Sequence, residues 1–265
     1  VTFQSHLDGS LHRLTPESAV ELQSGFGVDV AMVLDECLPY PVDLGTARSS
    51  TERSVRWAVR GLHRAEAIRG EGSWRGGLFA IQQGSVDRAL RAWCSEQLAG
   101  HAFDGFAIGG LAVGEPTEVL HEAIAFSAPL LPADRPHYLM GVGYPEDILH
   151  AVACGVDLFD CVLPTRSART GKVFTSRGEL VIKNARFADD PEPLDPSCSC
   201  PTCARYSRGA LRHLFVSKEA ASVVLLTVHN LTYFLDLMRQ ARDAIMTRRY
   251  AAFRARIEAG RREGV

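Results

Sequence analysis

Three closely spaced cysteines, Cys198, Cys200 and Cys203, carry the clearest chemistry in this 265-residue chain. The pattern Cys-x-Cys-x-x-Cys brings three thiolates onto one tight turn, and zinc takes four nitrogen or sulfur ligands in a tetrahedron. A set of three cysteines and one histidine leaves no position open for water and is therefore structural. The candidates for the fourth ligand are His229, which follows an apolar run, and His213, which lies nearer the cysteines. The spacing predicts one structural zinc ion.

A second candidate for chemistry is Asp160, which ends the apolar stretch 156–159. The basic stretch 165–172 follows it and contains three cations and no acid. A carboxylate in such surroundings is a candidate nucleophile toward a phosphate-bearing substrate. Asp157 lies three residues earlier and would point to the opposite face of a strand. The alternative is that Asp160 only caps backbone N–H groups at the strand end, and the residues alone leave both possibilities open.

A third group of residues could read a flat ligand. Asp35 and Gln83 each follow a short apolar run, and so does the pair Gly109-Gly110. Glycine lets a ligand approach backbone N–H and C=O groups closely. A carboxylate, an amide and glycine backbone groups offer donors and acceptors in one plane, as the edge of a purine requires. Asp35 could also be a simple strand-end cap and each signal is weak by itself, so the prediction of a base pocket depends on these residues lying together.

The elements that would bring these residues together are strands that alternate with helices. Five apolar runs predict strands, and such continuous runs are typical of parallel strands that are buried on both faces. The polar residues come just after these runs, at the carboxyl end of the sheet, where α/β folds place their chemistry. The strands are expected at residues 30–34, 78–81, 106–108, 137–140 and 156–159. Helix starts are expected at Thr15-Pro16, at a capping box over Ser49–Glu52, at Ser85, at Pro116 and at Pro145.

Composition limits the class of protein. With 46% hydrophobic and 23% charged residues the chain is an ordinary globular sequence, and its net charge of −2 excludes a generally basic protein that coats nucleic acid. No run of about 18 apolar residues is present, so we expect no membrane span. Seven cysteines, three of them clustered, fit reduced thiols and a metal in the cytoplasm better than a secreted disulfide framework. The expected domains are a partial barrel (1–170), a zinc-binding subdomain (171–235) and an Arg-rich helical segment (236–265).

Several stretches, taken together, resemble bacterial tRNA-guanine transglycosylases, and the likeness extends over essentially the whole chain. Besides the cysteine cluster, they are SHLDGS (5–10), LDECLPYP (34–41), IQQGS (81–85), FDGFAIGGLAVGE (103–115), HYLMGVG (137–143) and VDLFDCVLPTRSARTG (156–171). The resemblance implies a (β/α)8 barrel of the TIM type with an inserted zinc subdomain near the C-terminus. It also implies exchange of the wobble guanine of tRNAs with a GUN anticodon for the 7-deazaguanine preQ1, on the route to queuosine.

The resemblance also assigns roles to individual residues. Asp160 matches the carboxylate that attacks ribose C1′ and holds the RNA as a covalent intermediate. Cys37 and Val113 look like the bacterial form, which takes preQ1. The positions that read or flank the base are Asp35, Gln83, Gly110, Leu111 and Met140. The RNA-contacting positions are Gly141, Val142, Gly143, Tyr144, Pro145, Glu146 and Asp147, with Thr165, Arg166, Ser167, Ala168 and Arg169. The zinc ligands are Cys198, Cys200, Cys203 and His229, which favours His229 over His213, and the family suggests a homodimer.

One departure from the family sets a further expectation. The family has an N-terminal motif, Asp-Ser-Gly-Gly-Tyr-Gln or similar, whose Asp acts as general acid and base, and this chain contains no such motif. Five strands are predicted where a closed barrel needs eight. We therefore expect the chain to be a fragment with impaired activity. The competing hypotheses are a non-catalytic partner subunit of the same fold, which would be expected to lose Asp160, and a zinc-ribbon binding module on an unrelated scaffold.

Overall fold

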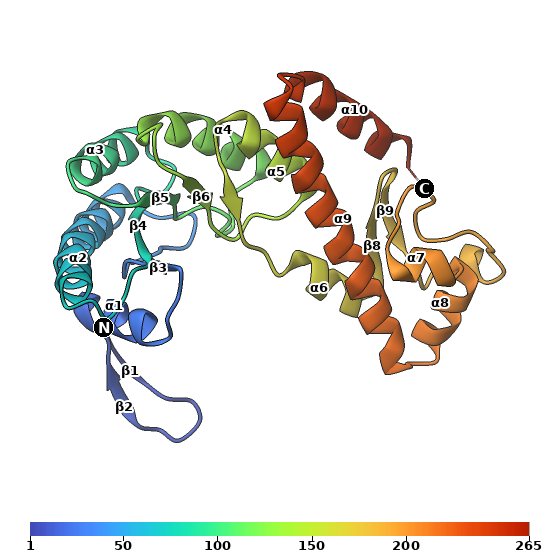
Figure 1. Cartoon of the computed structure of the whole chain (residues 1–265), viewed down its shortest axis with the longest axis horizontal. Helices are drawn as coiled ribbons and strands as arrows, with labels where there is room; N and C mark the ends of the chain where they lie inside the picture. Colours follow the sequence, from blue (N-terminus) through green and yellow to red (C-terminus); the bar gives the residue numbers. More distant parts are fainter. Residues whose placement is uncertain (265) are drawn as a thin grey trace. The chain divides into compact units, whose positions relative to one another are not determined.

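The computed structural model describes residues 1–264, and these form two compact units (Figure 1). The first unit holds residues 1–142 and 150–160, and the second holds residues 143–149 and the chain from 161 onward. The division into domains at 170 and 235 stays a prediction.

A five-stranded parallel sheet forms the centre of the first unit. Its strands lie side by side in chain order, and the sheet curls like half of a barrel, with helices along its outer face (Figure 1). Most of the apolar core lies between the sheet and these helices, as continuous apolar runs predict. The five predicted strands and their parallel arrangement are thus confirmed. The strands are β3 (Val30–Met32), β4 (Gly77–Gln82), β5 (Gly105–Ile108), β6 (His137–Leu139) and β7 (Leu158–Phe159).

Carboxylates close the amino end of this sheet. Asp104 precedes β5, and its side chain accepts from the backbone N–H of Leu78 in the neighbouring strand (2.8 Å) and from Arg69 (2.5 Å). Asp157 precedes β7 and accepts from the N–H of His137 in the same way (2.8 Å). Both side chains satisfy backbone donors that the ladder leaves unpaired. The carboxylates at the amino end of the sheet therefore stabilise the fold, whereas the carboxyl end of the sheet is formed by the loops that follow the strands.

The helices of the first unit begin where capping side chains allow. Helix α1 (Pro16–Gly25) starts at Thr15, as predicted, and the structure adds a capping box there between Thr15 and Ser18. Helix α2 (Leu44–Gly70) starts at Asp43, so the box expected at Ser49–Glu52 is wrong: Ser50 is buried inside the helix and its hydroxyl donates to the Glu36 carbonyl (2.9 Å).

Of the three later helix starts, one differs from the expectation, one refines it and one confirms it. Helix α3 (Arg88–Ala99) is capped by Asp87, not by Ser85, which has a positive φ of 50°. Helix α4 (Thr117–Ser127) has Pro116 as its N-cap, followed by the short helix η1 (Ala128–Leu130), and α5 (Pro145–Ala153) starts with its proline in the first turn, as predicted. An antiparallel hairpin of β1 (Thr2–Gln4) and β2 (Leu11–Arg13) was not predicted.

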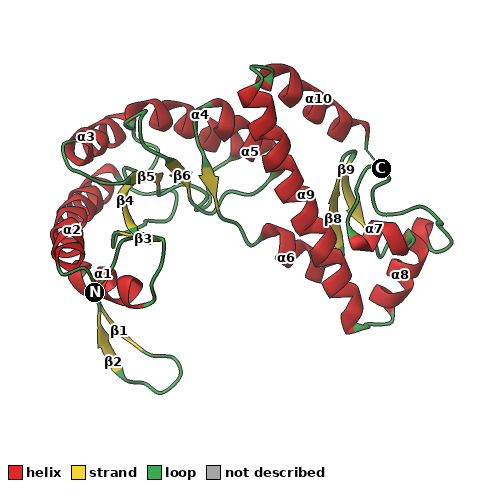
Figure 2. Ribbon diagram, viewed as in Figure 1, coloured by secondary structure: helices red, strands yellow, loops and turns green. Residues whose placement is uncertain are grey.

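The second unit is a hairpin packed among helices (Figure 2). Residues 163–169, which include much of the basic stretch after Asp160, form a helix, and the hairpin follows at residues 172–181. The apolar core of this unit includes Val173, Leu180, Leu211 and Leu226. The elements are α6 (Leu163–Arg169), β8 (Lys172–Thr175), β9 (Gly178–Val181), η2 (Ala185–Phe187), α7 (Pro201–Arg205), α8 (Arg208–Val216), α9 (Ala220–Met246) and α10 (Tyr250–Glu263).

Helix α9 is the central helix of the second unit. It is long and apolar enough to cross a membrane by length and composition, although it contains no unbroken apolar run of about 18 residues, and among the described helices it alone meets that test. It nevertheless buries Ser222, His229 and Asn230 and packs against α6, α7, α8, α10 and β8. Buried polar side chains with protein partners are features of a core helix, and we interpret α9 as one.

Candidate active site and metal centre

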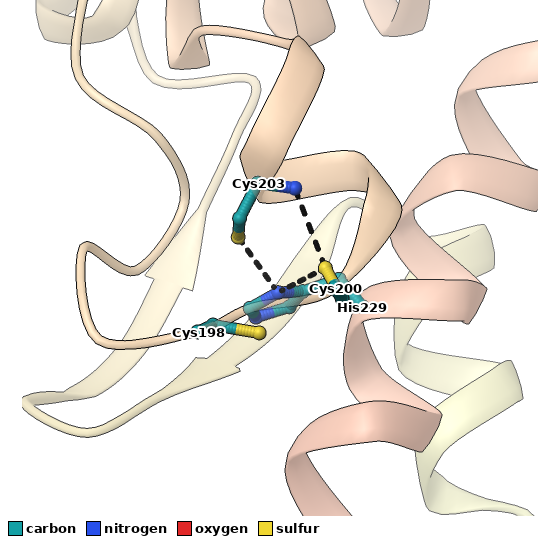
Figure 3. Close-up of side chains that lie close together, drawn as sticks. All are labelled: Cys198, Cys200, Cys203 and His229. Atoms are coloured by element: carbon teal, nitrogen blue, oxygen red, sulfur yellow. Dashed lines mark hydrogen bonds between the residues drawn. The ribbon is translucent and has the colours of Figure 1, made fainter.

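The four predicted metal ligands come together in the second unit (Figure 3). Their ligand atoms all lie within 4.8 Å of one another, and His229 and Cys200 are almost fully buried. A zinc tetrahedron with bonds of 2.0–2.3 Å separates its ligand atoms by about 3.5–3.8 Å, so the cluster needs little contraction to close on an ion. His213 lies on α8 and is not part of the cluster. The geometry therefore selects His229.

Local structure explains how this cluster forms. Cys200 is the N-cap of α7, and its sulfur accepts from the backbone N–H of Cys203 (3.3 Å), so the two thiols share one helical turn. His229 comes from the middle of α9, and its Nε2 lies 2.9 Å from the carbonyl oxygen of Phe174 in β8. That bond assigns the proton to Nε2 and leaves Nδ1, 3.2 Å from the Cys203 sulfur, as the ligand atom. The hydrogen bond with Cys203 and the neighbouring His229 lower the pKa of the Cys198 thiol. The cluster could hold a metal ion.

A second group of predicted residues meets at the carboxyl end of the sheet in the first unit. Gln83 Nε2 donates to the Asp35 carboxylate (2.6 Å), across the ends of β4 and β3. Gly110 has a φ of +65°, and a side chain there would lie 2.4 Å from Gln83 Oε1, so glycine is required on both counts. Burial raises the pKa of Asp35. A carboxylate, an amide and a glycine turn thus converge, as the sequence predicted.

The other predicted base-pocket residues surround this group. Desolvation and then the charge of Asp35 raise the pKa of the Cys37 thiol, which places this thiol beside the Asp35 carboxylate. Leu111 is buried, and the segment after β3 touches the Val113 loop through a bond from the Tyr40 N–H to the Val113 carbonyl (3.4 Å). Met140 is half-buried at the end of β6, against the core. A small pocket opens here, lined by Leu38, Ala47, Ser50, Thr51, Gln83, Gly84, Ser85 and Gly110.

Asp160 is exposed and held in place at the end of β7. The Tyr138 hydroxyl and the Gly141 backbone N–H both donate to its Oδ1, at 2.7 and 2.8 Å. Burial and this bond to Asp160 raise the pKa of Tyr138, which keeps the phenol protonated as a donor. The second oxygen, Oδ2, has no hydrogen-bond partner among the side chains and backbone groups that the structure describes. A carboxylate fixed through one oxygen and open at the other is arranged to attack an electrophile.

The predicted RNA-contacting residues are divided between exposed and buried positions. Gly141, Tyr144, Arg166 and Arg169 are exposed, and Thr165 and Glu146 are half-buried. Glu146 forms an ion pair with Arg261 of α10 (2.6 Å) within the second unit. The buried residues of the set are Val142, Gly143, Pro145, Asp147, Ser167 and Ala168. The RNA contacts of the whole set stay a prediction.

Tyr138 and Glu115 also shape the site, although neither was predicted from the sequence. Tyr138 lies inside a predicted strand, where an aromatic residue passes for core, and only the ladder between β6 and β7 brings it to Asp160. Glu115 accepts from the backbone N–H groups of Ala112 and Val113 and so fixes the turn after Gly110. The positive φ of 58° at Ala112 is part of that turn. A glutamate following a glycine-rich turn was the only available signal.

Comparisons with known proteins show the family of this chain. A family profile described as queuine tRNA-ribosyltransferase matches residues 1–263. Proteins named queuine tRNA-ribosyltransferase are similar to the chain: that of Sphingopyxis alaskensis is 53% identical over 96% of the chain and 68% of its own length. Those of Nitratidesulfovibrio vulgaris and Zymomonas mobilis are 50% and 48% identical over 98% and 96% of the chain, and over 68% and 65% of their own lengths. The chain spans about two thirds of the length of these relatives and belongs to the queuine tRNA-ribosyltransferase family.

Proposed function

We propose that this chain carries the chemistry of a tRNA-guanine transglycosylase, exchanging the wobble guanine of GUN-anticodon tRNAs for preQ1. The observation that supports this most strongly is the carboxylate of Asp160, held through Oδ1 by Tyr138 and Gly141 with Oδ2 open. The Asp35–Gln83–Gly110 group lies at the same end of the sheet as Asp160, because this group and Asp160 all follow the carboxyl ends of parallel strands. A non-catalytic subunit would have no use for this pairing of nucleophile and pocket.

The proposed reaction is a double displacement at ribose C1′. Oδ2 of Asp160 attacks C1′, the C1′–N9 bond breaks, and its electron pair leaves with guanine, which takes up a proton. The RNA is then held as an ester of Asp160. The incoming base attacks C1′ through its own ring nitrogen and loses a proton there, and the ester electrons return to the carboxylate. The target base must leave its stack for Asp160 to reach C1′.

In this proposal the pocket recognises the edge of the flipped base. Asp35 accepts hydrogen bonds, the amide of Gln83 can donate and accept, and the backbone of Gly110 and Leu111 supplies groups in the same plane. Met140 would pack on the base from the end of β6. The family resemblance of Cys37 and Val113 supports preQ1 as the incoming base.

The remaining assignments extend the same proposal. The donor set of three sulfurs and one imidazole nitrogen fits zinc, which Cys198, Cys200, Cys203 and His229 would hold as a structural ion that takes no part in the reaction. The exposed Arg166 and Arg169 would bind RNA phosphates. We also propose that the half-barrel corresponds to part of a (β/α)8 barrel, that the protein acts as a homodimer, and that it works in the cytoplasm, where its tRNA substrate is.

A covalent trap tests the proposal. The protein is incubated with tRNA without an acceptor base and analysed on a denaturing gel, where an RNA-linked band is expected. Asp160→Asn should abolish this band because an amide is too weak a nucleophile. Asp157→Asn is the matched control: its amide oxygen can still accept from the His137 N–H, so the band should persist. An adduct that survives in Asp160→Asn would show that another residue is the nucleophile.

A further inference from the structure

Arg91 is a fully buried cation behind the base pocket. It lies on α3 with 1% of its surface exposed, and no carboxylate among the described side chains forms an ion pair with it. Burial lowers its pKa to about 10, so the guanidinium stays charged at neutral pH. A buried charge without an acid partner is costly, and its hydrogen bonds must compensate.

Those hydrogen bonds all go to the segments that carry the pocket. Arg91 donates through Nε to the Ser85 carbonyl (2.5 Å), through one terminal nitrogen to Gln82 Oε1 (3.2 Å), and through the other to the Gly109 carbonyl (2.9 Å). Ser85 follows the end of β4, and Gly109 follows the end of β5. One planar group therefore joins the two turns that present Gln83 and Gly110.

The turns are shaped to receive this side chain. Gly84 has a φ of +135°, and a side chain there would lie 2.8 Å from the Arg91 backbone nitrogen and 3.0 Å from its Cγ. The side chain of Gln82 contacts Arg91 through its oxygen and donates through its nitrogen to Ser95 (2.5 Å), which itself donates to the Arg91 carbonyl (3.0 Å). The contacts around Arg91 thus form a closed network.

We propose that Arg91 is a positioning residue that sets the distance and orientation between Gln83 and the Gly110 turn, and thereby the fit of the pocket to a purine. The effect of Arg91 on the fit to a purine rests on the proposed function, whereas its positioning of the two turns does not. Arginine suits this role because its donors form a fixed fork, whereas lysine offers the same charge from a single point. Arg91→Lys therefore separates the geometry from the charge.

A merely structural role predicts a different result, and the chain offers a matched control. Arg69 binds at the amino end of the same sheet, where it donates to the Gly76 carbonyl (2.7 Å) and to the Asp104 carboxylate (2.5 Å). Arg69→Met should destabilise the same sheet without touching the pocket. Arg91→Lys and Arg91→Met should instead act on the two turns.

The experiment measures hydrogen exchange and guanine binding in the full chain and its variants. In Arg91→Lys, exchange in peptides covering residues 83–86 and 109–112 should rise at least about fivefold, with little change at residues 76–79. Equilibrium dialysis with labelled guanine should show a Kd raised roughly tenfold or more, because small displacements of positioning groups have large effects. Arg69→Met should show the opposite pattern, faster exchange at 76–79 and an unchanged Kd.

Hydrogen exchange and guanine binding test the two parts of the proposal separately. Unchanged exchange at both turns in Arg91→Lys and Arg91→Met overturns the positioning role, whatever the protein binds. Faster exchange with a Kd within twofold of the unmodified protein overturns the link to purine fit. Faster exchange in a protein whose unmodified form binds no guanine supports the positioning of the turns and refutes the proposed function instead.

Discussion

Asn230 is the side chain whose loss we expect to damage the second unit most cleanly. It is fully buried on α9, and its amide makes three hydrogen bonds. The nitrogen donates to the carbonyls of Pro164 (2.9 Å) and Lys172 (3.2 Å), and the oxygen accepts from the Phe174 N–H (3.1 Å). One side chain thus ties α9 to α6 and to β8.

The cost of Asn230→Ala follows from the groups left behind. The Pro164 carbonyl and the Phe174 N–H lose a partner in buried surroundings, while the Lys172 carbonyl belongs to a half-exposed residue that water can reach. A buried polar group without a partner costs about 1–3 kcal/mol, so two of them give about 2–6 kcal/mol. Water entering the vacated space lowers that figure, and we expect a loss of about 3 kcal/mol in the free energy of unfolding.

The measurement must report on the second unit alone. All three tryptophans, Trp57, Trp74 and Trp93, lie in the first unit, so tryptophan fluorescence is unsuitable. Urea-dependent hydrogen exchange of peptides covering residues 172–182 reports on the hairpin, where a loss of 3 kcal/mol lowers the midpoint by about 1–3 M. Asn184→Ala is the control: this asparagine is exposed and makes no side-chain capping bond. If Asn230→Ala costs no more than this control, the amide does not hold the helices together.

Two further predictions concern the metal cluster and Asp35. Cys198→Ala should abolish binding of one zinc ion per chain and loosen the second unit, whereas His213→Ala should leave zinc content unchanged; metal analysis by atomic absorption distinguishes them. Burial raises the pKa of Asp35, so its contribution to stability is complete at low pH and is lost as the pH rises through the folded-state pKa. Asp35→Asn should therefore raise Tm at pH 7 and leave it unchanged near pH 3, as scanning calorimetry can show; equal shifts at both pH values would contradict this.

The parallel sheet could be predicted because each strand is an apolar run whose burial on both faces is visible in its residue types. The positions of Asp35, Gln83, Gly110 and Asp160 could then be predicted as well, because residues that come just after parallel strands all lie at the carboxyl end of the sheet. Helix starts were less predictable: Ser49–Glu52 has the pattern of a capping box, but the hydroxyl of Ser50 is satisfied by Glu36, a tertiary contact that spacing does not show. Asp43, with its single bond to the Thr46 N–H, was the actual cap.

The candidate site shows the same limit. Three cysteines on one turn could be predicted from spacing, but His229 lies 26 residues beyond Cys203, and the residues alone left His213 open. Tyr138 and Arg91 were missed because their partners are brought to them by strand pairing and helix packing, not by sequence distance. Residue type and spacing can predict a nucleophile or a metal ligand, but they rarely predict the side chains that hold it in position.

The shortest strand of the sheet leaves no room for insertions or deletions. In β7 only Leu158 and Phe159 pair with β6, and the residues on either side, Asp157 and Asp160, are each bound to β6 or the turn after it. Removing one residue between these two aspartates would shift the second by about 3.3 Å and turn it to the other face of the sheet. A substitution at Leu158, which is exposed, leaves the number of residues between the two aspartates unchanged. Homologues should therefore vary in residue type at this strand while keeping its length constant.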